Sequence, residues 1–362
     1  YAGIIEEIAA NGNTLRETRL KLSAKAYTHT ALYDSHIATY MRKAAGLDEK
    51  LFLAFDAIQT LRYGENPHQA ATFYRSPEEV SYSVAHARQL GGKELSYNNI
   101  QDANAALNIV REFDEPFCVA LKHMNPCGAG IGENLLQAWT RAYEADKVSI
   151  YGGIVAMNRP LTAEVAALMK PIFLEIVMAP AFEPEALEVL ASKKNLRLLE
   201  VKMDNVKACQ KQYVGVNGGL LVQDADIECK DITPDMCVTE RKPTEKELSE
   251  LDFGWKIVKH VKSNAIVVVK DGATAGVGAG QMNRVGSAEI ALEEAKAAGI
   301  TEGLVLASDG FLPFGDTVEL ASKYGVTAIV QPGGSIRDED SIKVANEKGI
   351  TMLFTGMRHF KH

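Results

Sequence analysis

Short apolar runs recur along most of the chain, separated by helical patterns and by turns rich in glycine or proline. Apolar runs bounded in this way predict buried strands. Strands that alternate with helices predict layers of α and β structure around a largely parallel sheet. The fold class predicted is therefore α/β. The candidate strands include Phe117–Leu121, Glu175–Pro180, Leu198–Val201, Ala265–Val269, Ala328–Pro332 and Thr351–Phe354.

A weak internal repeat relates two parts of the sequence, residues 51–212 and 213–362. Phe117–Asn125 has a counterpart in Lys262–Val269, and a glycine-rich run follows each. We expect those runs, 128–132 and 276–280, to form turns. Tyr151–Ile154 and Ser308–Phe311 also correspond, each before a helical pattern. The repeat predicts two related α/β units, joined through the polar segment 224–247.

The first fifty residues have a different character. Thr14 to about Gly46 is expected to be helical, with Thr14–Glu17 as a capping box, and Leu51–Phe55 is a strand candidate. The chain begins with Tyr1 in the middle of a pattern. We expect a piece of a longer protein, in which residues 1–50 are the end of another domain and a linker.

Composition narrows the classes of function. The 362 residues are 46% hydrophobic and 24% charged, as in globular proteins of the cytoplasm, where we expect this one. The net charge of −8 argues against general binding to nucleic acid or to anionic membranes. There is no apolar stretch of membrane-spanning length and no signal-peptide pattern. The five cysteines are scattered, which predicts reduced thiols and gives no zinc motif.

The pair Lys122-His123 at the end of the run Phe117–Leu121 is the strongest chemical feature. A cation and an imidazole at a strand end suit proton transfer combined with charge stabilisation. Consecutive strand residues point to opposite faces, so both serve one site only if the chain leaves the extended conformation here. The following Asn125-Pro126 is expected to provide that turn.

Several familiar motifs are absent from the sequence: a P-loop, a complete G-x-G-x-x-G and a G-x-S-x-G elbow. A zinc deaminase would need H-x-E and P-C-x-x-C. His123-Met124-Asn125 lacks the glutamate, and the segment from Pro126 lacks the second cysteine. This near miss suggests a deaminase-like backbone without its metal.

Several motifs in matching order resemble the aminoimidazole carboxamide ribonucleotide (AICAR) transformylase part of the bifunctional purine-biosynthesis enzymes. The resemblance runs from about residue 51 to the C-terminus, and residues 1–50 resemble the end of the inosinate cyclohydrolase domain. The motifs are Leu61–Gln69, Leu95–Asn99, Leu121–His123, Gly278–Gln281, Ser308–Phe314 and Arg358–His362.

The resemblance implies duplicated cytidine-deaminase-like, three-layer α/β/α domains without zinc. It also implies a homodimer with active sites at the subunit interface. From the net charge we expect no partner that is a nucleic acid or a membrane. The reaction implied is formyl transfer from 10-formyltetrahydrofolate, as co-substrate, to the 5-amino group of AICAR, without a catalytic metal. Cyclohydrolase activity is expected to be absent because most of that domain is missing.

The family's site residues are carried over by position. His123 matches the general base and Lys122 the transition-state stabiliser. Glu175 stands where the family usually has aspartate. Asn98 matches a substrate-side position, with the alternative that Asn98-Asn99 caps the helix Asp102–Val110. The other substrate-side positions are Arg62, Tyr63, Gly153, Asn264, Arg284, Phe311, Arg358 and His362, and the folate-side positions are Asp316, Ser335 and Ile336.

Two other functions stay open. A nucleotide deaminase is disfavoured by the missing glutamate and cysteine, and bound zinc would favour it again. A non-catalytic fragment that binds purine or folate is compatible with the sequence. Folate-dependent turnover by the chain separates this alternative from the transferase.

Overall fold

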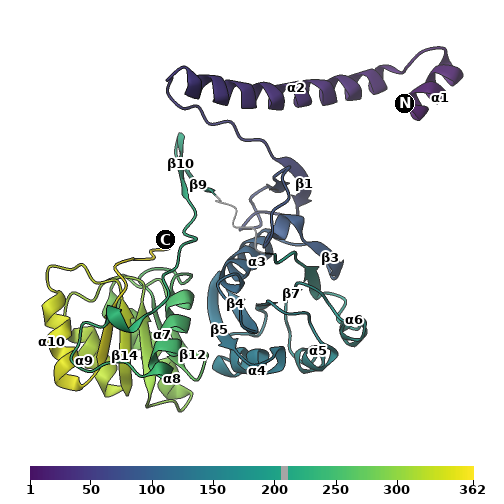
Figure 1. Ribbon diagram of the computed structural model, residues 1–362. Coiled ribbons are helices and arrows are strands. Elements are labelled where there is room, and N and C mark those ends of the chain that lie inside the picture. Colours follow the sequence, from purple (N-terminus) through teal and green to yellow (C-terminus); the bar gives the residue numbers. More distant parts are fainter. Residues whose placement is uncertain (205–210) are drawn as a thin grey trace. The chain divides into compact units, whose positions relative to one another are not determined.

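The computed structural model describes residues 1–204 and 211–362, so Cys209 lies outside the described residues. The chain divides into two compact units (Figure 1). The first consists of Tyr1–Ile58 with Tyr74–Glu78, and the second of Gln59–Phe73 with Glu79–His362. The second unit contains every predicted site residue.

The first unit is mainly helical. Its helices are α1 (Ala2–Asn11) and α2 (Arg16–Ala44), which confirms the predicted helix, but no residue of either is buried. The capping box was wrong, because Leu15 is the N-cap of α2 and its side chain accepts no capping hydrogen bond. The strand predicted at 51–55 was also wrong: the strand β1 begins only at Asp56. β1 (Asp56–Leu61) and β2 (Ala71–Arg75) form a two-stranded sheet.

Within the described residues, the second unit contains an eleven-stranded sheet in the order β15-β14-β13-β11-β12-β5-β4-β6-β7-β8-β3. The apolar runs predicted as strands from Phe117 onward all lie in this sheet. Its strands are β3 (Arg88–Gly91), β4 (Phe117–Lys122), β5 (Asn125–Ile131), β6 (Ile154–Met157), β7 (Ile176–Ala179), β8 (Arg197–Glu200), β11 (Ile266–Lys270), β12 (Ala273–Gly278), β13 (Leu304–Ser308), β14 (Val326–Gln331) and β15 (Thr351–Phe354).

Helices cover both faces of the sheet, which confirms the predicted three-layer α/β fold (Figure 1). The prediction of a largely parallel sheet was wrong, because six of its ten strand pairs in the described residues are antiparallel. One face packs against α3 (Tyr97–Val110) and α7 (Glu245–Val258). The opposite face packs against α4 (Leu135–Ala145), α5 (Ala163–Met169), α6 (Pro184–Leu190), α8 (Arg284–Ala297), α9 (Asp316–Lys323) and α10 (Asp338–Lys348).

Burial on both faces explains why the strands are continuous apolar runs. In β4, Val119 and Leu121 enter the core beneath α3, while Cys118 and Ala120 enter the core beneath α4 and α5. Successive strand residues point to opposite faces, so each must be apolar. Full burial of one valine or leucine side chain stabilises the fold by roughly 1.5–3 kcal/mol.

Each half of the sheet repeats one topology: a hairpin, a helix, and then three parallel strands separated by helices. The first half contains β4–β8 and the second β11–β15. The correspondence predicted for Tyr151–Ile154 and Ser308–Phe311 was wrong, since Gly153 precedes β6 whereas Ser308 ends β13. The domain boundary at residues 212 and 213 stays a prediction.

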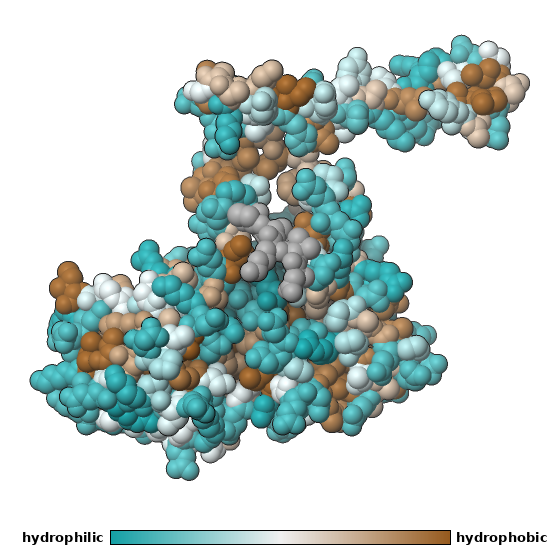
Figure 2. Space-filling model, in the orientation of Figure 1, coloured by the Kyte–Doolittle hydropathy of each residue, from teal (hydrophilic) through white to brown (hydrophobic). Residues whose placement is uncertain are grey.

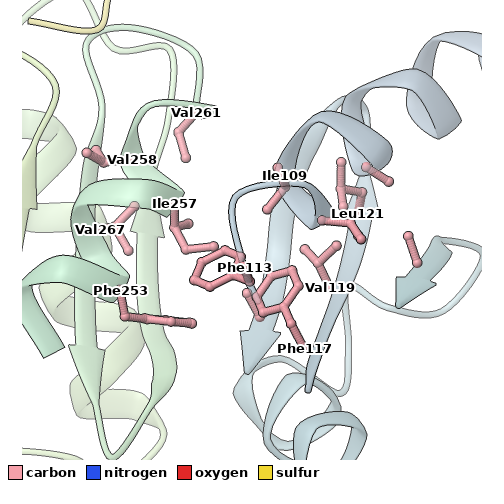
Figure 3. Packing of buried hydrophobic residues seen from close by; sticks show 14 of the residues in the cluster. Ile109, Phe113, Phe117, Val119, Leu121, Phe253, Ile257, Val258, Val261 and Val267 are labelled. Atoms are coloured by element: carbon pink, nitrogen blue, oxygen red, sulfur yellow. The ribbon is translucent and has the colours of Figure 1, made fainter. Parts of the chain in front are cut away.

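The two halves share one hydrophobic core (Figure 3). Phe113 stacks on Phe117 with 4.0 Å between ring centroids, and it contacts Phe253 from α7 at 5.5 Å. Offset or tilted aromatic contacts of this kind add about 0.5–1.5 kcal/mol beyond their buried area. The aromatic cluster therefore holds α7 of the second half against α3 and β4 of the first.

The glycine-rich runs lie inside strands β5 and β12, so their prediction as turns was wrong. A Cβ atom on Gly128 would lie 2.1 Å from the carbonyl oxygen of Ala142 in α4. A Cβ atom on Gly276 would lie 2.0 Å from the carbonyl oxygen of Ala291 in α8. The glycines are needed because a helix backbone packs directly on each strand.

Strand directions bring many strand ends to one edge of the sheet. β4 is antiparallel to β5 and β6, β5 is antiparallel to β12, and β11 is antiparallel to β12 and β13. The strands β6–β8 are parallel, as are β13–β15. Consequently β4 and β13–β15 end, and β6–β8 and β11 begin, at the same edge, which we name the common edge.

The second unit also carries a fully exposed hairpin, β9 (Lys211–Val216) and β10 (Gly219–Asp224). Its exposed apolar side chains are Tyr213, Val214, Val216, Leu220, Leu221 and Val222. Hydrophobic residues also appear elsewhere on the surface (Figure 2). Because an isolated two-stranded hairpin is at best marginally stable in water, this one is suited to contact with a further surface.

The glycine packing gives a test of the fold. Gly276→Ala should lower the free energy of unfolding by about 1–3 kcal/mol, since its methyl group would overlap the backbone of α8. Gly215→Ala is the matched control because a Cβ atom there has nothing within 4 Å. Urea denaturation measures both variants. Equal stability of the two variants would contradict the packing described.

Candidate functional site

A two-residue turn presents Lys122 and His123 at the common edge. Lys122 is the last residue of β4 and pairs with Asn125, so His123 and Met124 form the turn of the β4–β5 hairpin. Their φ angles are 54° and 62°, as in a type I′ turn. The chain therefore leaves the extended conformation at His123, which is the condition for Lys122 and His123 to serve one site. The turn predicted at Asn125-Pro126 was wrong, because those residues begin β5.

Neighbouring groups hold this turn in place. The Met124 N–H donates to Asp102 Oδ1 in α3 at 2.7 Å. Burial raises the pKa of Asp102, against the opposing effects of that hydrogen bond and of His123. Lys122 Nζ donates to the carbonyl oxygen of Tyr151 at 2.9 Å. The ammonium is thus fixed by one of its three N–H groups, while the His123 side chain is exposed.

Gly153 and Glu175 lie beside Lys122 along the common edge, where β6 and β7 begin. Gly153 is buried, and a Cβ atom there would lie 2.7 Å from the carbonyl oxygen of Leu121. The Glu175 N–H donates to the Gly153 carbonyl at 2.9 Å. Glu175 Oε2 accepts from Arg197 Nη1 at 2.6 Å. The sequence prediction missed Arg197, whose place at the start of β8 was the available signal.

Arg62, Tyr63 and Asn98 are also in the second unit. The Arg62 side chain is exposed, and its guanidinium lies 5.7 Å from the ring centroid of Tyr63. Asn98 does not cap its helix: Ser96 is the N-cap of α3 and Asn99 completes the capping box. Asn98 Nδ2 donates a long hydrogen bond to the Glu65 carbonyl oxygen at 3.5 Å.

Asn264 and Arg284 contact each other directly. Asn264 precedes β11 and Arg284 begins α8, and Arg284 Nη2 donates to Asn264 Oδ1 at 2.8 Å. Arg284 Nη1 and Ser263 Oγ both donate to the fully buried carboxylate of Asp309. Asp309 was not among the predicted site residues, although it lies in the Ser308–Phe314 motif. It anchors this second group by charge and by hydrogen bonds.

The two groups are joined along the edge by the segment before β11. The Lys262 N–H donates to Asn125 Oδ1 at 3.0 Å, and the Gly280 N–H donates to the Lys262 carbonyl at 2.7 Å. Three strand spacings separate β4 from β11, or roughly 14 Å at ~4.8 Å each. The structure therefore brings the residues into two neighbouring groups, which we name the first group (around His123) and the second group (around Asn264).

The remaining substrate-side residues belong to the second group. Phe311 follows β13, and Arg358 and His362 follow β15, so all three lie in segments that leave the common edge. The guanidinium of Arg358 lies over Phe360, 4.7 Å from its ring centroid. The Phe360 and His362 rings are 5.8 Å apart between centroids. These side chains are exposed and aromatic or cationic, as a phosphorylated heterocycle would need.

The predicted folate-side residues lie in the segments after β13 and β14. Asp316 begins α9 and is exposed. The Ser335 N–H donates to Asp338 Oδ2 at 3.1 Å, and Ser335 Oγ accepts from the Arg337 N–H at 3.1 Å. Ile336 is fully exposed. An apolar side chain between polar groups suits the rim of a pterin-binding surface.

A buried charged cluster lies where the ends of α3 and α7 meet. Glu112 Oε1 accepts from Lys259 Nζ at 3.0 Å and is 2.9 Å from His260 Nε2. Burial opposes ionisation of Glu112, but His260 and Lys259 outweigh it and lower the pKa to about 2. Burial lowers the pKa of His260 to about 4, against the opposing effect of Glu112.

In the part of the chain that the structure describes, no group of three or more His, Cys, Asp or Glu side chains is arranged to hold a metal ion. The described cysteines are free thiols, and burial raises the pKa of Cys127 and Cys229 to about 12. None of the helices in those residues is both long and apolar enough to span a membrane.

The chain is similar in sequence to a family of purine-biosynthesis proteins. Residues 1–294 match the family described as "AICARFT/IMPCHase bienzyme". The "bifunctional purine biosynthesis protein PurH" of Bacillus cytotoxicus and that of Anoxybacillus flavithermus are each 57% identical to this chain. That of Bacillus thuringiensis strain Al Hakam is 56% identical. Each alignment covers 100% of this chain and 71% of the relative.

The buried His260 predicts a loss of stability in mild acid. In the unfolded chain it binds a proton near its ordinary pKa of 6.5, but in the folded protein only near 4. Its contribution is therefore present above pH 6.5 and is lost as the pH falls toward 4. Between pH 7.5 and pH 5, urea denaturation should show a smaller loss for His260→Gln than for the unsubstituted protein.

Glu112 adds to the loss only below about pH 4.5, its ordinary pKa, so measurements down to pH 5 isolate His260. His29→Gln, a substitution on the exposed surface of α2, is the matched control and should keep the full pH dependence. If His260→Gln and the unsubstituted protein lose the same free energy of unfolding, burial of a neutral His260 is ruled out.

Proposed function

Because the chain belongs to the AICARFT/IMPCHase bienzyme family, we propose that it transfers a formyl group from 10-formyltetrahydrofolate to the 5-amino group of AICAR. The products are formyl-AICAR and tetrahydrofolate. The reaction is a step of purine biosynthesis, and the cytoplasm is its proposed compartment. Ring closure to inosinate is not assigned to this chain.

The observation that carries the proposal is that the predicted catalytic residues and most of the substrate-side residues lie along one edge of the sheet, the common edge. A reactive pair, Lys122 and His123, leaves the sheet in a tight turn next to Gly153 and Glu175. The same edge carries the Asn264–Arg284 group and the C-terminal arginine. A proton acceptor, an ammonium group and guanidinium groups thus lie on one surface, as formyl transfer to a phosphorylated amine requires.

His123 is the proposed general base. The amine of AICAR is a poor nucleophile because its lone pair is delocalised into an imidazole that bears a carboxamide. As the amine nitrogen attacks the formyl carbon, it must lose a proton, and the exposed His123 imidazole is suited to accept it. The new nitrogen–carbon bond forms, and the bond from the formyl carbon to the folate nitrogen breaks. The protonated His123 can return its proton to that folate nitrogen, which gives tetrahydrofolate.

Lys122 is the proposed transition-state stabiliser. Negative charge develops on the formyl oxygen during the attack, and an oriented cation lowers its energy. The bond to the Tyr151 carbonyl orients the ammonium and leaves two N–H groups for that oxygen. Removal of one such group typically lowers turnover by about 100- to 1000-fold.

The ribonucleotide is proposed to bind through both groups. Arg62 and Arg358 suit its phosphate or ribose, because guanidinium groups form paired hydrogen bonds with phosphate oxygens. Phe311 offers an aromatic face, and Asn264 and Arg284 offer amide and guanidinium groups. The other proposed contacts are Tyr63, Asn98, Gly153, Glu175 and His362. Asp316, Ser335 and Ile336 are proposed to contact the folate.

The length of the edge supports the proposed homodimer with shared active sites. From Glu175 at β7 to Ser335 at β14 there are seven strand spacings, roughly 34 Å in all. In a twofold-symmetric dimer each surface faces its own copy, so the first group of one subunit can meet the second group of the other. The exposed apolar hairpin β9–β10 supports such a contact.

Two substitutions test the assigned roles. His123→Ala should lower turnover at least ~100-fold while changing the affinity for AICAR by less than about threefold, because only proton transfer is lost. Arg358→Ala should instead weaken AICAR binding by about tenfold or more, since it removes a charged hydrogen-bond donor. Folate-dependent formyl transfer and calorimetric titration with AICAR measure the two effects.

Arg75→Ala, an exposed arginine of β2, is the control for the arginine substitution and should leave both values unchanged. Retention of most turnover by His123→Ala would remove the base from the mechanism. No folate-dependent turnover by the unsubstituted chain would favour the non-catalytic binding fragment.

Mixing two inactive variants tests the shared sites. His123→Ala and Asn264→Ala homodimers should each be nearly inactive. After subunit exchange in equal amounts, activity should rise to about a quarter of the unsubstituted value, since half the dimers are hybrids with one intact site of two. If mixing restores no activity although sedimentation shows hybrid dimers, each site lies within one chain.

A further inference from the structure

The C-terminal segment after β15 alternates between exposed and buried positions. Arg358, Phe360 and His362 are exposed, whereas His359 is 1% exposed and Lys361 is partly buried. An extended chain points successive side chains to opposite sides. The two inward side chains are both polar, so their hydrogen-bond partners decide how the segment is held.

His359 is held by its side chain and its backbone. Its Nδ1 atom lies 2.6 Å from Asp226 Oδ2, and its N–H donates to the Asp309 carbonyl at 3.1 Å. The ring packs against Trp255, with 5.0 Å between centroids. Asp226 follows the hairpin strand β10, and Asp309 belongs to the second group. His359 therefore ties the segment to two separate parts of the unit.

Lys361 attaches the segment to the loop before β11. Its Nζ donates to the His260 carbonyl at 2.8 Å, and its own carbonyl accepts from the Ser263 N–H at 2.8 Å. Burial, with a smaller effect of Lys262, lowers the pKa of Lys361 to about 8. Burial of an ammonium group costs free energy. The hydrogen bond to His260 offsets part of this cost and fixes the orientation of the segment.

We propose that His359 and Lys361 are positioning residues, which hold the C-terminal segment so that Arg358 and His362 face the ribonucleotide. The identity of the ligand, the ribonucleotide AICAR, is taken from the proposed function. Phe360 completes the arrangement: the Arg358 guanidinium lies over its ring, and a Cβ atom on Gly310 would be 2.8 Å from Phe360 Cε1. Glycine at 310 thus leaves room for the ring that supports the arginine.

Lys361→Met tests the proposal, because methionine keeps much of the side-chain volume but removes the ammonium. Hydrogen exchange of the peptide that ends at His362 should become about tenfold faster, since the anchored amides open more often. The dissociation constant for AICAR should rise about tenfold, with kcat changed less than about threefold. Lys323→Met, at the end of α9 near the opposite edge, is the control and should match the unsubstituted protein.

A double substitution separates positioning from general stability. If Lys361 acts through Arg358 and His362, then Lys361→Met should change the AICAR affinity by clearly less than about tenfold when Arg358 is already alanine, since only the effect through His362 remains. Asp226→Ala, which removes the half-exposed partner of His359, should show the same pattern. This second variant decides the question if Lys361→Met does not fold.

The outcomes are distinguishable. The positioning role is overturned if the C-terminal peptide of Lys361→Met exchanges hydrogen no faster than that of the Lys323→Met control. It is also overturned if Lys361→Met causes the same loss of AICAR affinity in the Arg358→Ala background as in the unsubstituted protein. If both variants loosen the segment but the unsubstituted chain binds no AICAR, the anchoring stands and the proposed function fails.

Discussion

The antiparallel contact between β5 and β12 is the constraint on which the site depends. Gly130 pairs with Ala273, and the Ile131 N–H donates to the Gly272 carbonyl at 2.9 Å. This single junction fixes the direction of the second half relative to the first. If the two strands were parallel, Asn264 would lie at the edge opposite His123. At the junction, Gly130 is buried, and Ala129 belongs to the core that also contains Phe113.

The reactive pair depends on a second constraint, the type of hairpin turn. Positive φ angles at His123 and Met124 cost about 1–2 kcal/mol each for residues with a side chain. The hydrogen bonds of Asp102 to Met124 and of Asn125 to Lys262 offset part of this cost. The strained turn releases His123 from the alternation of β4, so that the imidazole and the ammonium can serve one reaction.

The sequence predicted the layers but not the contacts between distant segments. Apolar runs such as Phe117–Leu121 identify strands because both of their faces are buried. Glycines 128 and 276 were predicted as turns because local sequence does not show that a helix backbone will pack on them. The turn at His123 carries none of the glycine or asparagine that favours type I′. Asp309 becomes visible as a site residue only when the fold places it beside Arg284. Arg197 had a signal in its place at the start of a strand, but its contact with Glu175 is a product of the fold.

The segment Lys262–Asn264 connects all of these parts. On one side, the Lys262 N–H is bonded to Asn125 at the reactive hairpin. On the other side, Ser263 is bonded to Lys361 and to Asp309, and Asn264 is bonded to Arg284. A displacement of this segment must therefore alter the hairpin, the second group and the C-terminal anchor together. His260 extends the connection to the buried charged cluster, since its Nε2 atom lies 2.9 Å from Glu112 Oε1 and its carbonyl accepts from Lys361, so the stability of the fold and the geometry of the site rest on the same few bonds.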